Sequence, residues 1–195
     1  MAMGTSAEQT AWLCLDGVPG VGPVRGLRLL AKASPEQLCQ MDAEQLQQLG
    51  LSWAQIDALQ HPDYQRIERV VRWCDEPGHN LISYLCDDYP AWLREIPAAP
   101  LLLFVDGDLS VLSAPQIALV GTRNPTPGGR AVAAMLTEGL VAEGLVITSG
   151  LALGIDATCH QMALRARGRT LAVLGSGLAQ CYPRRHLSLR SEERR

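Results

Sequence analysis

Several features that mark common classes of protein are missing from this sequence. No hydrophobic run approaches the roughly eighteen residues that a membrane-spanning helix requires, which predicts that a membrane is not a partner. Residues 1–9 lack a basic segment followed by an apolar stretch, and this argues against a secretory signal. The six cysteines are scattered without a Cys-x-x-Cys pair, which argues against a disulfide framework or a zinc site. We therefore expect reduced thiols and a cytoplasmic location.

Arrangements of residues that carry catalysis are missing as well. The spacing of side chains offers no Ser-His-Asp or Cys-His arrangement, no metal-ligand cluster and no pair of catalytic carboxylates. The G-x-G-x-x-G fingerprint of dinucleotide binding and the Walker A loop are also absent. These absences predict a protein that is not an enzyme and that holds no cofactor or metal.

Charge is unevenly distributed along the chain, although the net charge of −3 does not suggest a nucleic-acid-binding protein. Residues 1–100 hold 7 basic and 13 acidic side chains, whereas residues 101–195 hold 10 basic and 7 acidic ones. Every basic residue of the second part is arginine, whose planar guanidinium pairs well with phosphate. A solvated, mildly basic face explains the same counts, so charge alone leaves both interpretations open.

Residues 1–78 are predicted to form a small helical domain. Helical spacing of apolar residues and a Ser34 cap followed by Pro35 and Gln37 predict a series of short helices. The expected helical ranges are 8–15, 24–33, a helix after Ser34, 42–49, 52–59 and 64–74. The glycine-rich segment 17–23 resembles the hairpin of a helix-hairpin-helix element, and a tight interhelical turn is the alternative. Residues 76–80 are rich in helix breakers and set the expected domain boundary.

After this boundary the sequence alternates between strand-like and helix-like segments. The expected strands are 81–85, 101–105, 116–120, 145–148 and 170–174, and the expected helices are 129–143 and 156–166. Such alternation is typical of βαβ units, so we expect an α/β fold with a parallel sheet. The strands are apolar at nearly every position, which predicts that both faces of the sheet are buried.

Three glycine-rich segments follow three of these strands. The first spans residues 121–130 and connects a strand to the start of a helix, where free N–H groups and a positive partial charge favour an anion. Arg123 can pair with a phosphate, and Thr126 can donate its hydroxyl. A purely structural βα turn is the alternative. The predicted contacts in this segment are Gly121, Thr122, Arg123, Thr126, Gly128 and Gly129.

The second and third segments lie after the next two strands. Ser149, Gly150 and Gly154 suit a close approach of phosphate or of neighbouring backbone. Asp156 is predicted to be the N-cap of the following helix. His160 lies four residues later on the same helix face, and we expect it to have a structural role. In the third segment, Gly175 and Gly177 suggest a dinucleotide site, but Gln180 occupies the position of its third glycine. Because the carboxyl ends of parallel strands share one edge of the sheet, we expect the three segments to form one phosphate-binding site.

Taken together, the three segments resemble the DNA processing protein A family (DprA, also called Smf). The first matches the pattern G-[ST]-R-x-P-[ST]-x-x-G from Gly121 to Gly129, and the second matches S-G-[LM]-A-x-G-I-D-x-x-x-H from Ser149 to His160. The third matches A-V-L-G-x-G-L-x-x-x-Y-P from Ala172 to Pro183. The resemblance covers the chain to about residue 186. It implies a helical SAM-like domain at residues 1–78 and the first part of the Rossmann-like domain at residues 79–186.

The resemblance implies binding and protection of single-stranded DNA and its transfer to the recombinase RecA during natural transformation, without catalysis. Arg123 and Thr126 would hold backbone phosphate. The family also implies a RecA contact and a homodimer for its full-length members. A phosphoribohydrolase of the lysine-decarboxylase-like group is the alternative, although its P-G-G-x-G-T-x-x-E signature is absent.

The end of the chain departs from the family pattern. Residues 187–195 form a polar tail that lacks the R-N-R-x-I-type segment expected after Pro183. We therefore expect a truncated member of the family with an incomplete sheet and a non-native or disordered tail. An incomplete sheet has an open strand edge, which favours aggregation or strand exchange.

Overall fold

The computed structural model describes residues 6–175 and 177–178, and the chain divides into two units, residues 1–105 and 106–195. Each unit has a hydrophobic cluster of its own. The boundary expected near residue 78 falls inside the first unit, because Leu81 and Leu101 belong to the core of that unit. The predicted division into domains 1–78 and 79–186 remains a prediction.

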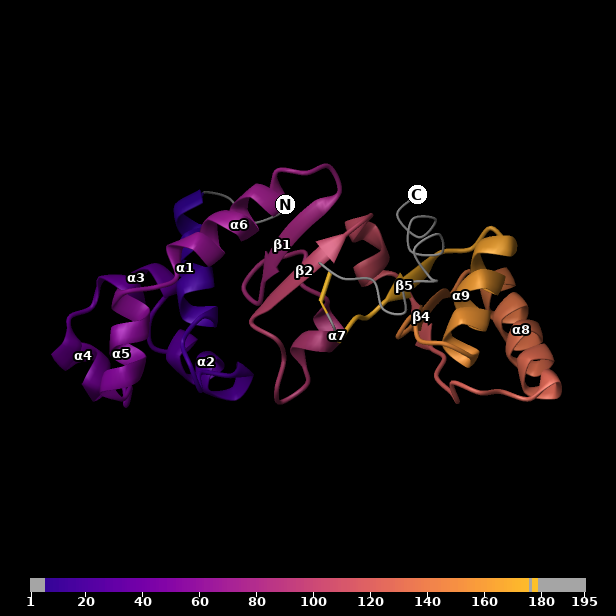
Figure 1. Ribbon diagram of the computed structural model, residues 1–195, viewed down its shortest axis with the longest axis horizontal. Helices are drawn as coiled ribbons and strands as arrows, with labels where there is room; N and C mark the ends of the chain where they lie inside the picture. Colours follow the sequence, from indigo (N-terminus) through magenta and orange to yellow (C-terminus); the bar gives the residue numbers. More distant parts are fainter. Residues whose placement is uncertain (1–5, 176, 179–195) are drawn as a thin grey trace. The chain divides into compact units, whose positions relative to one another are not determined.

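The first unit is mainly helical (Figure 1). Its elements are α1 (Ser6–Asp16), α2 (Pro23–Leu30), α3 (Pro35–Gln40), α4 (Ala43–Gln48), α5 (Trp53–Gln60), α6 (Tyr64–Cys74), β1 (His79–Ser83), α7 (Ala91–Arg94) and β2 (Leu102–Asp106). The helices expected from α1 to α6 are all present. The sequence did not predict α7, which is only four residues long and follows Pro90.

Side-chain caps explain where the short helices begin. Ser34 accepts a hydrogen bond from the backbone N–H of Gln37, and the Gln37 side chain accepts one from the backbone N–H of Ser34. Asp42 and Gln45 repeat this reciprocal pair at the start of α4. Such boxes satisfy N–H groups that have no partner inside the helix. The cap predicted at Ser34 is confirmed.

The core of the first unit forms where the apolar faces of these helices meet. Trp12, Leu15 and Leu46 are at most 2% exposed. Between α1 and α2 the chain makes a tight turn, in which Val18 and Val21 are buried and Gly20 has φ +72°. The tight interhelical turn is therefore present, whereas DNA contact by this segment remains a prediction.

A buried tyrosine organises the connection between β1 and β2. Tyr89 is 2% exposed and donates its hydroxyl to the Pro100 carbonyl at 2.9 Å. The Arg94 guanidinium lies over the rings of Tyr84 and Tyr89. Burial raises the pKa of Tyr89 to about 12, and Tyr84 adds to this effect. The hydroxyl therefore keeps its proton and its hydrogen bond at any physiological pH.

The second unit contains a parallel sheet in the strand order β3-β4-β5. Its elements are the 3₁₀ helix η1 (Leu109–Ser113), β3 (Gln116–Ala118), α8 (Pro127–Ala142), β4 (Val146–Ser149), α9 (Ile155–Arg165) and β5 (Thr170–Ala172). The expected α/β class and parallel pairing are confirmed. The sequence did not predict η1.

Helices α8 and α9 lie side by side against the sheet (Figure 1). Ala133 of α8, Ile147 of β4 and Cys159 of α9 share one apolar cluster, so both helices cover the same face. Two right-handed crossovers that step in the same direction along a sheet produce this arrangement.

The prediction that all strands are buried is wrong for β3. Every residue of β3 is exposed, whereas Val146 and Ile147 of β4 are fully buried. Strand β4 lies between two strands, whereas β3 pairs with β4 alone among the described residues.

Candidate nucleic-acid interface

Three loops follow the three parallel strands, and the sheet therefore brings them to its carboxyl edge. We call residues 119–126 loop 1, residues 150–154 loop 2, and residues 173–178 loop 3, of which residue 176 lies outside the described part. The predicted gathering of the three segments at one edge is thus present for the described residues.

Loop 1 ends in the N-cap of the longest described helix, α8. Thr126 accepts a hydrogen bond from the N–H of Gly129 at 3.1 Å through its hydroxyl, and its carbonyl accepts the N–H of Arg130 at 3.0 Å. Pro127 has no N–H. Among the described residues, the N–H of Gly128 is therefore the one in this first turn that is left for water or a ligand.

The polar side chains of loop 1 face solvent. Thr122, Arg123 and Thr126 are exposed, while Pro125 is buried and anchors the loop. No described carboxylate forms an ion pair with Arg123. An exposed guanidinium, a hydroxyl and a helix N-terminus with a free N–H thus occur within one short loop. This combination suits a phosphate group.

Loop 1 rests directly on loop 2. The N–H of Ile155 donates to the Thr122 carbonyl at 3.1 Å. Gly154 has φ +86°, and a Cβ at this position would lie 2.3 Å from the Thr122 carbonyl oxygen. A Cβ on Gly121 would lie 2.7 Å from the Ile155 side chain. Glycine at positions 121 and 154 therefore permits the close packing of the two loops.

Two buried side chains of α9 accept hydrogen bonds from the backbone of loop 2. Asp156 accepts hydrogen bonds from the N–H groups of Gly150 and Ala152, at 3.2 and 3.4 Å. His160 accepts the N–H of Leu151 at 3.3 Å through Nε2. Consecutive N–H groups of the loop are thereby bound to α9, which holds Leu151 at φ +54°.

The tautomer of His160 follows from its other partner. Thr170 donates its hydroxyl hydrogen to the Ile147 carbonyl at 2.7 Å, so the hydroxyl oxygen accepts a hydrogen bond from Nδ1–H of His160, also at 2.7 Å. Nδ1 therefore carries the hydrogen, and the Nε2 lone pair accepts from loop 2. Because His160 is fully buried, it connects α9, β4, β5 and loop 2 without contact with solvent.

The structure gives internal roles to the predicted site residues at the end of β4 and in loop 2. Ser149 is buried and donates its hydroxyl to the Leu119 carbonyl at 2.6 Å. The N–H of Gly150 is bound to Asp156, and the backbone of Gly154 packs on loop 1. The N-cap predicted at Asp156 is wrong, because the helix begins one residue earlier and Gly154 is its N-cap. DNA contact by Ser149, Gly150 and Gly154 remains a prediction.

Loop 3 is described only in part. Val173 continues the ladder by donating its N–H to the Ser149 carbonyl at 2.9 Å. Gly175 and Gly177 are exposed, and Gly177 has φ +73°. Their role in DNA binding remains a prediction, and residues 179–195 lie outside the described part.

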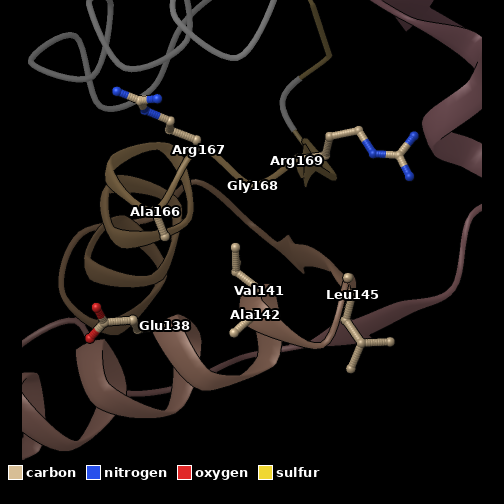
Figure 2. Close-up of a pocket in the computed structure, with 9 residues that line it drawn as sticks. Glu138, Val141, Ala142, Leu145, Ala166, Arg167, Gly168 and Arg169 are labelled. Carbon is tan, nitrogen blue, oxygen red and sulfur yellow. The ribbon is translucent and has the colours of Figure 1, made fainter.

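A hollow of about 530 Å³ lies at the opposite edge of the sheet, between the ends of α8 and α9. Val141, Ala142, Leu145 and Gly168 line it, and the charged ends of Arg167 and Arg169 point away from it in different directions (Figure 2). Polar groups do not converge there. Within residues 6–175 and 177–178, His, Cys, Asp and Glu side chains form no group that could hold a metal. We therefore place the candidate site at loop 1.

No helix in the described part of the chain combines the length and the apolar character needed to cross a membrane.

A parallel sheet with loops gathered at its carboxyl edge, preceded by a helical unit, defines a Rossmann-like α/β protein. The family model for DNA recombination-mediator protein A matches residues 80–194, and the model for the SMF/DprA SAM domain matches residues 6–72. The chain belongs to the DprA/Smf family. The SAM-like helical domain predicted from the sequence is confirmed by this match.

Individual relatives agree with this assignment. The chain is 42% identical over 127 residues to DNA processing protein DprA of Bacillus subtilis, covering 65% of this chain and 43% of that protein. It is 39% identical over 149 residues to protein Smf of Escherichia coli, covering 76% of this chain and 40% of that protein. The chain thus spans less than half the length of these curated relatives. The phosphoribohydrolase alternative finds no support among these matches.

Solved structures of DprA proteins are also similar. DprA from Streptococcus pneumoniae matches with a TM-score of 0.76 and 30% identity, over 98% of this chain and 64% of that chain. DprA from Helicobacter pylori, whose structure addresses its single-stranded DNA binding mode, matches with a TM-score of 0.50 and 30% identity, over 54% of this chain and 48% of that chain.

Proposed function

We propose that this chain binds single-stranded DNA by holding backbone phosphate at loop 1. The observation that carries the proposal is the Arg123 guanidinium, which has no ion-pair partner among the described residues. It shares a short loop with the Thr126 hydroxyl and with the Gly128 N–H, which has no acceptor in the same part of the chain. Similarity to the H. pylori protein with a described single-stranded DNA binding mode supports DNA as the source of that phosphate.

The proposed biological role is that of the family: protection of single-stranded DNA and its delivery to RecA during natural transformation. Contact with RecA and formation of a homodimer are part of this proposal. This chain covers only 40% to 43% of the two curated relatives described above, so both belong to the proposal for the whole protein. Phosphate binding at loop 1 depends on the described residues alone and is therefore tested first.

Arg123→Ala is the direct test. We expect the affinity for an unstructured single-stranded oligonucleotide to fall about tenfold. The negative slope of log affinity against log salt concentration should become shallower by about one, because one phosphate contact is lost. Fluorescence anisotropy with labelled DNA at several salt concentrations measures both quantities. Because the contact is to phosphate, the loss is expected to be the same for different base sequences.

Arg165→Ala is the matched control. Arg165 is an exposed arginine near the end of α9, at the edge of the sheet opposite loop 1. The proposal is overturned if binding does not depend on salt, if Arg123→Ala binds as tightly as the unchanged protein, or if both variants lose the same affinity.

A further inference from the structure

Two cysteines of the helical unit meet across a helix pair. Cys14 lies on α1 and Cys39 on α3, and these helices pack side by side (Figure 1). Each thiol is the largest single influence on the pKa of the other, so the two side chains lie close together. The sulfur of Cys39 also lies 4.0 Å from the Ala11 carbonyl, one helical turn before Cys14, which places it over the same face of α1. In the described residues both thiols are free.

The surroundings favour ionisation of Cys14 over that of its neighbours. The hydrogen bond from Cys39 and the positive charge of Arg66 lower the pKa of the Cys14 thiol, although burial opposes them. Arg66 is held in place by the Leu13 carbonyl and by Asp16. Burial instead raises the pKa of Cys74 and of Cys159. The thiolate is the reactive form of cysteine, so Cys14 is favoured as the nucleophile.

Access to the pair is provided by the second cysteine. Cys14 is 6% exposed and belongs to the core, whereas Cys39 is only partly buried at the edge of the same core. A small oxidant can therefore approach the pair from the side of Cys39, and a large one cannot reach Cys14.

We propose that Cys14 and Cys39 form a redox-responsive pair that closes to a disulfide between α1 and α3 when the protein meets hydrogen peroxide. The Cys14 thiolate attacks one peroxide oxygen, the O–O bond breaks, and the departing hydroxide takes a proton to form water. The sulfur of Cys39 then attacks the sulfur of the Cys14 sulfenic acid. The S–O bond breaks, the S–S bond forms, and the second water leaves with the remaining thiol proton. Two thiols are thereby oxidised and one peroxide is reduced to two waters.

The test counts thiols in the whole chain. Native, reduced protein is treated with a small excess of hydrogen peroxide, quenched in acid, unfolded, alkylated and weighed by mass spectrometry. We expect a loss of about 2 Da before alkylation, from the two hydrogens removed. We also expect alkylation of four of the six cysteines, and a linkage between the tryptic fragments Met1–Arg25 and Ala33–Arg66.

Variants give matched controls. Cys14→Ser and Cys39→Ser should each keep all five remaining thiols open to alkylation, whereas Cys74→Ser should still lose two of five. The fragment linkage is read on the unchanged protein, so the test does not depend on the folding of a variant. Any of three results would overturn the proposal. All six thiols could stay intact, either cysteine could carry sulfinic acid in place of the linkage, or the disulfide could join other cysteines.

Discussion

At the residue scale, the candidate site depends on side chains that lie beneath it. His160 is fully buried and holds Leu151 of loop 2 and Thr170 of β5 at the same time. Loop 1, which carries Arg123, rests on loop 2 through Thr122 and Ile155. The exposed groups that are proposed to hold phosphate therefore depend on buried groups that do not touch it.

Removing His160 tests this dependence. His160→Ala deletes the hydrogen bonds to the Leu151 N–H and to the Thr170 hydroxyl oxygen and opens a cavity. We expect the free energy of unfolding of the second unit to fall by about 2–4 kcal/mol. Urea unfolding followed by circular dichroism measures the change. His61→Ala is the control, because the His61 side chain is 76% exposed and should cost less than about 0.5 kcal/mol. Equal effects of the two substitutions would contradict the structural role of His160.

Two glycines offer an opposed pair of substitutions. Gly154→Ala places a Cβ 2.3 Å from the Thr122 carbonyl oxygen at φ +86°, so we expect a loss of more than about 2 kcal/mol in the free energy of unfolding. Gly139 lies inside α8, where an added Cβ would have no neighbouring atom within 4 Å, so Gly139→Ala should stabilise by up to about 1 kcal/mol. Thermal or urea unfolding measures both. A stabilising Gly154→Ala would show that loops 1 and 2 can separate without cost.

The sequence predicted which residues surround the site but not what each of them does. Alternation of strands and helices was enough to bring residues 121–130 and 149–156 to one edge of the sheet. The pattern could not show that the N–H groups of Gly150 and Ala152 are bound to Asp156, because Asp is also a common N-cap and the two roles have the same local signature. Only the complete set of hydrogen-bond partners separates an N–H group that is free for a ligand from one that is already bound.

At the element scale, α8 connects local stability with the proposed ligand. Thr126 caps this helix, and the same residue borders the free N–H of Gly128. We expect Thr126→Ala to lower the free energy of unfolding by about 1 kcal/mol and also to weaken DNA binding, because the loss of the cap lets the first turn fray. Thr126→Ser keeps the hydroxyl and should restore both properties. Urea unfolding and anisotropy are the two measurements.

Ser34→Ala provides the control for the cap. It removes an equivalent cap from α3 in the first unit and should cost a similar free energy. Its DNA affinity should equal that of the unchanged protein. A loss of affinity in Ser34→Ala as large as that in Thr126→Ala would mean that general destabilisation, and not the N-terminus of α8, determines binding.

Elements with strong local signals were the ones that the sequence predicted well. Helix α3 follows a Ser-Pro start with Gln37 three residues later, and the structure has this capping box. Helix α7 is only four residues long and follows Pro90, so it has no room for a periodic pattern. The burial of β3 was predicted wrongly because the composition of a strand does not show which elements cover its faces. Neighbours distant in sequence decide that difference.

At the scale of the whole molecule, the two units have cores of unequal size. The first contains Trp12, Leu46 and Ile56 among many buried apolar side chains. The second has, among its described residues, a small buried cluster around Ile147. Since buried apolar area dominates stability, we expect the second unit to be the less stable of the two.

The distribution of tryptophan makes this expectation measurable. All four tryptophans, Trp12, Trp53, Trp73 and Trp92, lie in the first unit, whereas circular dichroism also detects α8 and α9 of the second. Unfolding in urea should therefore begin with a loss of helical signal at constant tryptophan fluorescence. The fluorescence should change only at higher urea concentration, and the two probes should give different midpoints.

Core substitutions assign each phase to a unit. Ile147→Ala should lower the midpoint of the first phase without moving the fluorescence transition, because Ile147 is fully buried in the small cluster. Leu46→Ala, at a fully buried position in the large core, should move the fluorescence transition instead. Each change removes about 2–5 kcal/mol, which exceeds the error of the measurement. Superimposable transitions in the two probes, shifted alike by both substitutions, would show that the two units unfold as one and that their separate cores do not confer separate stability.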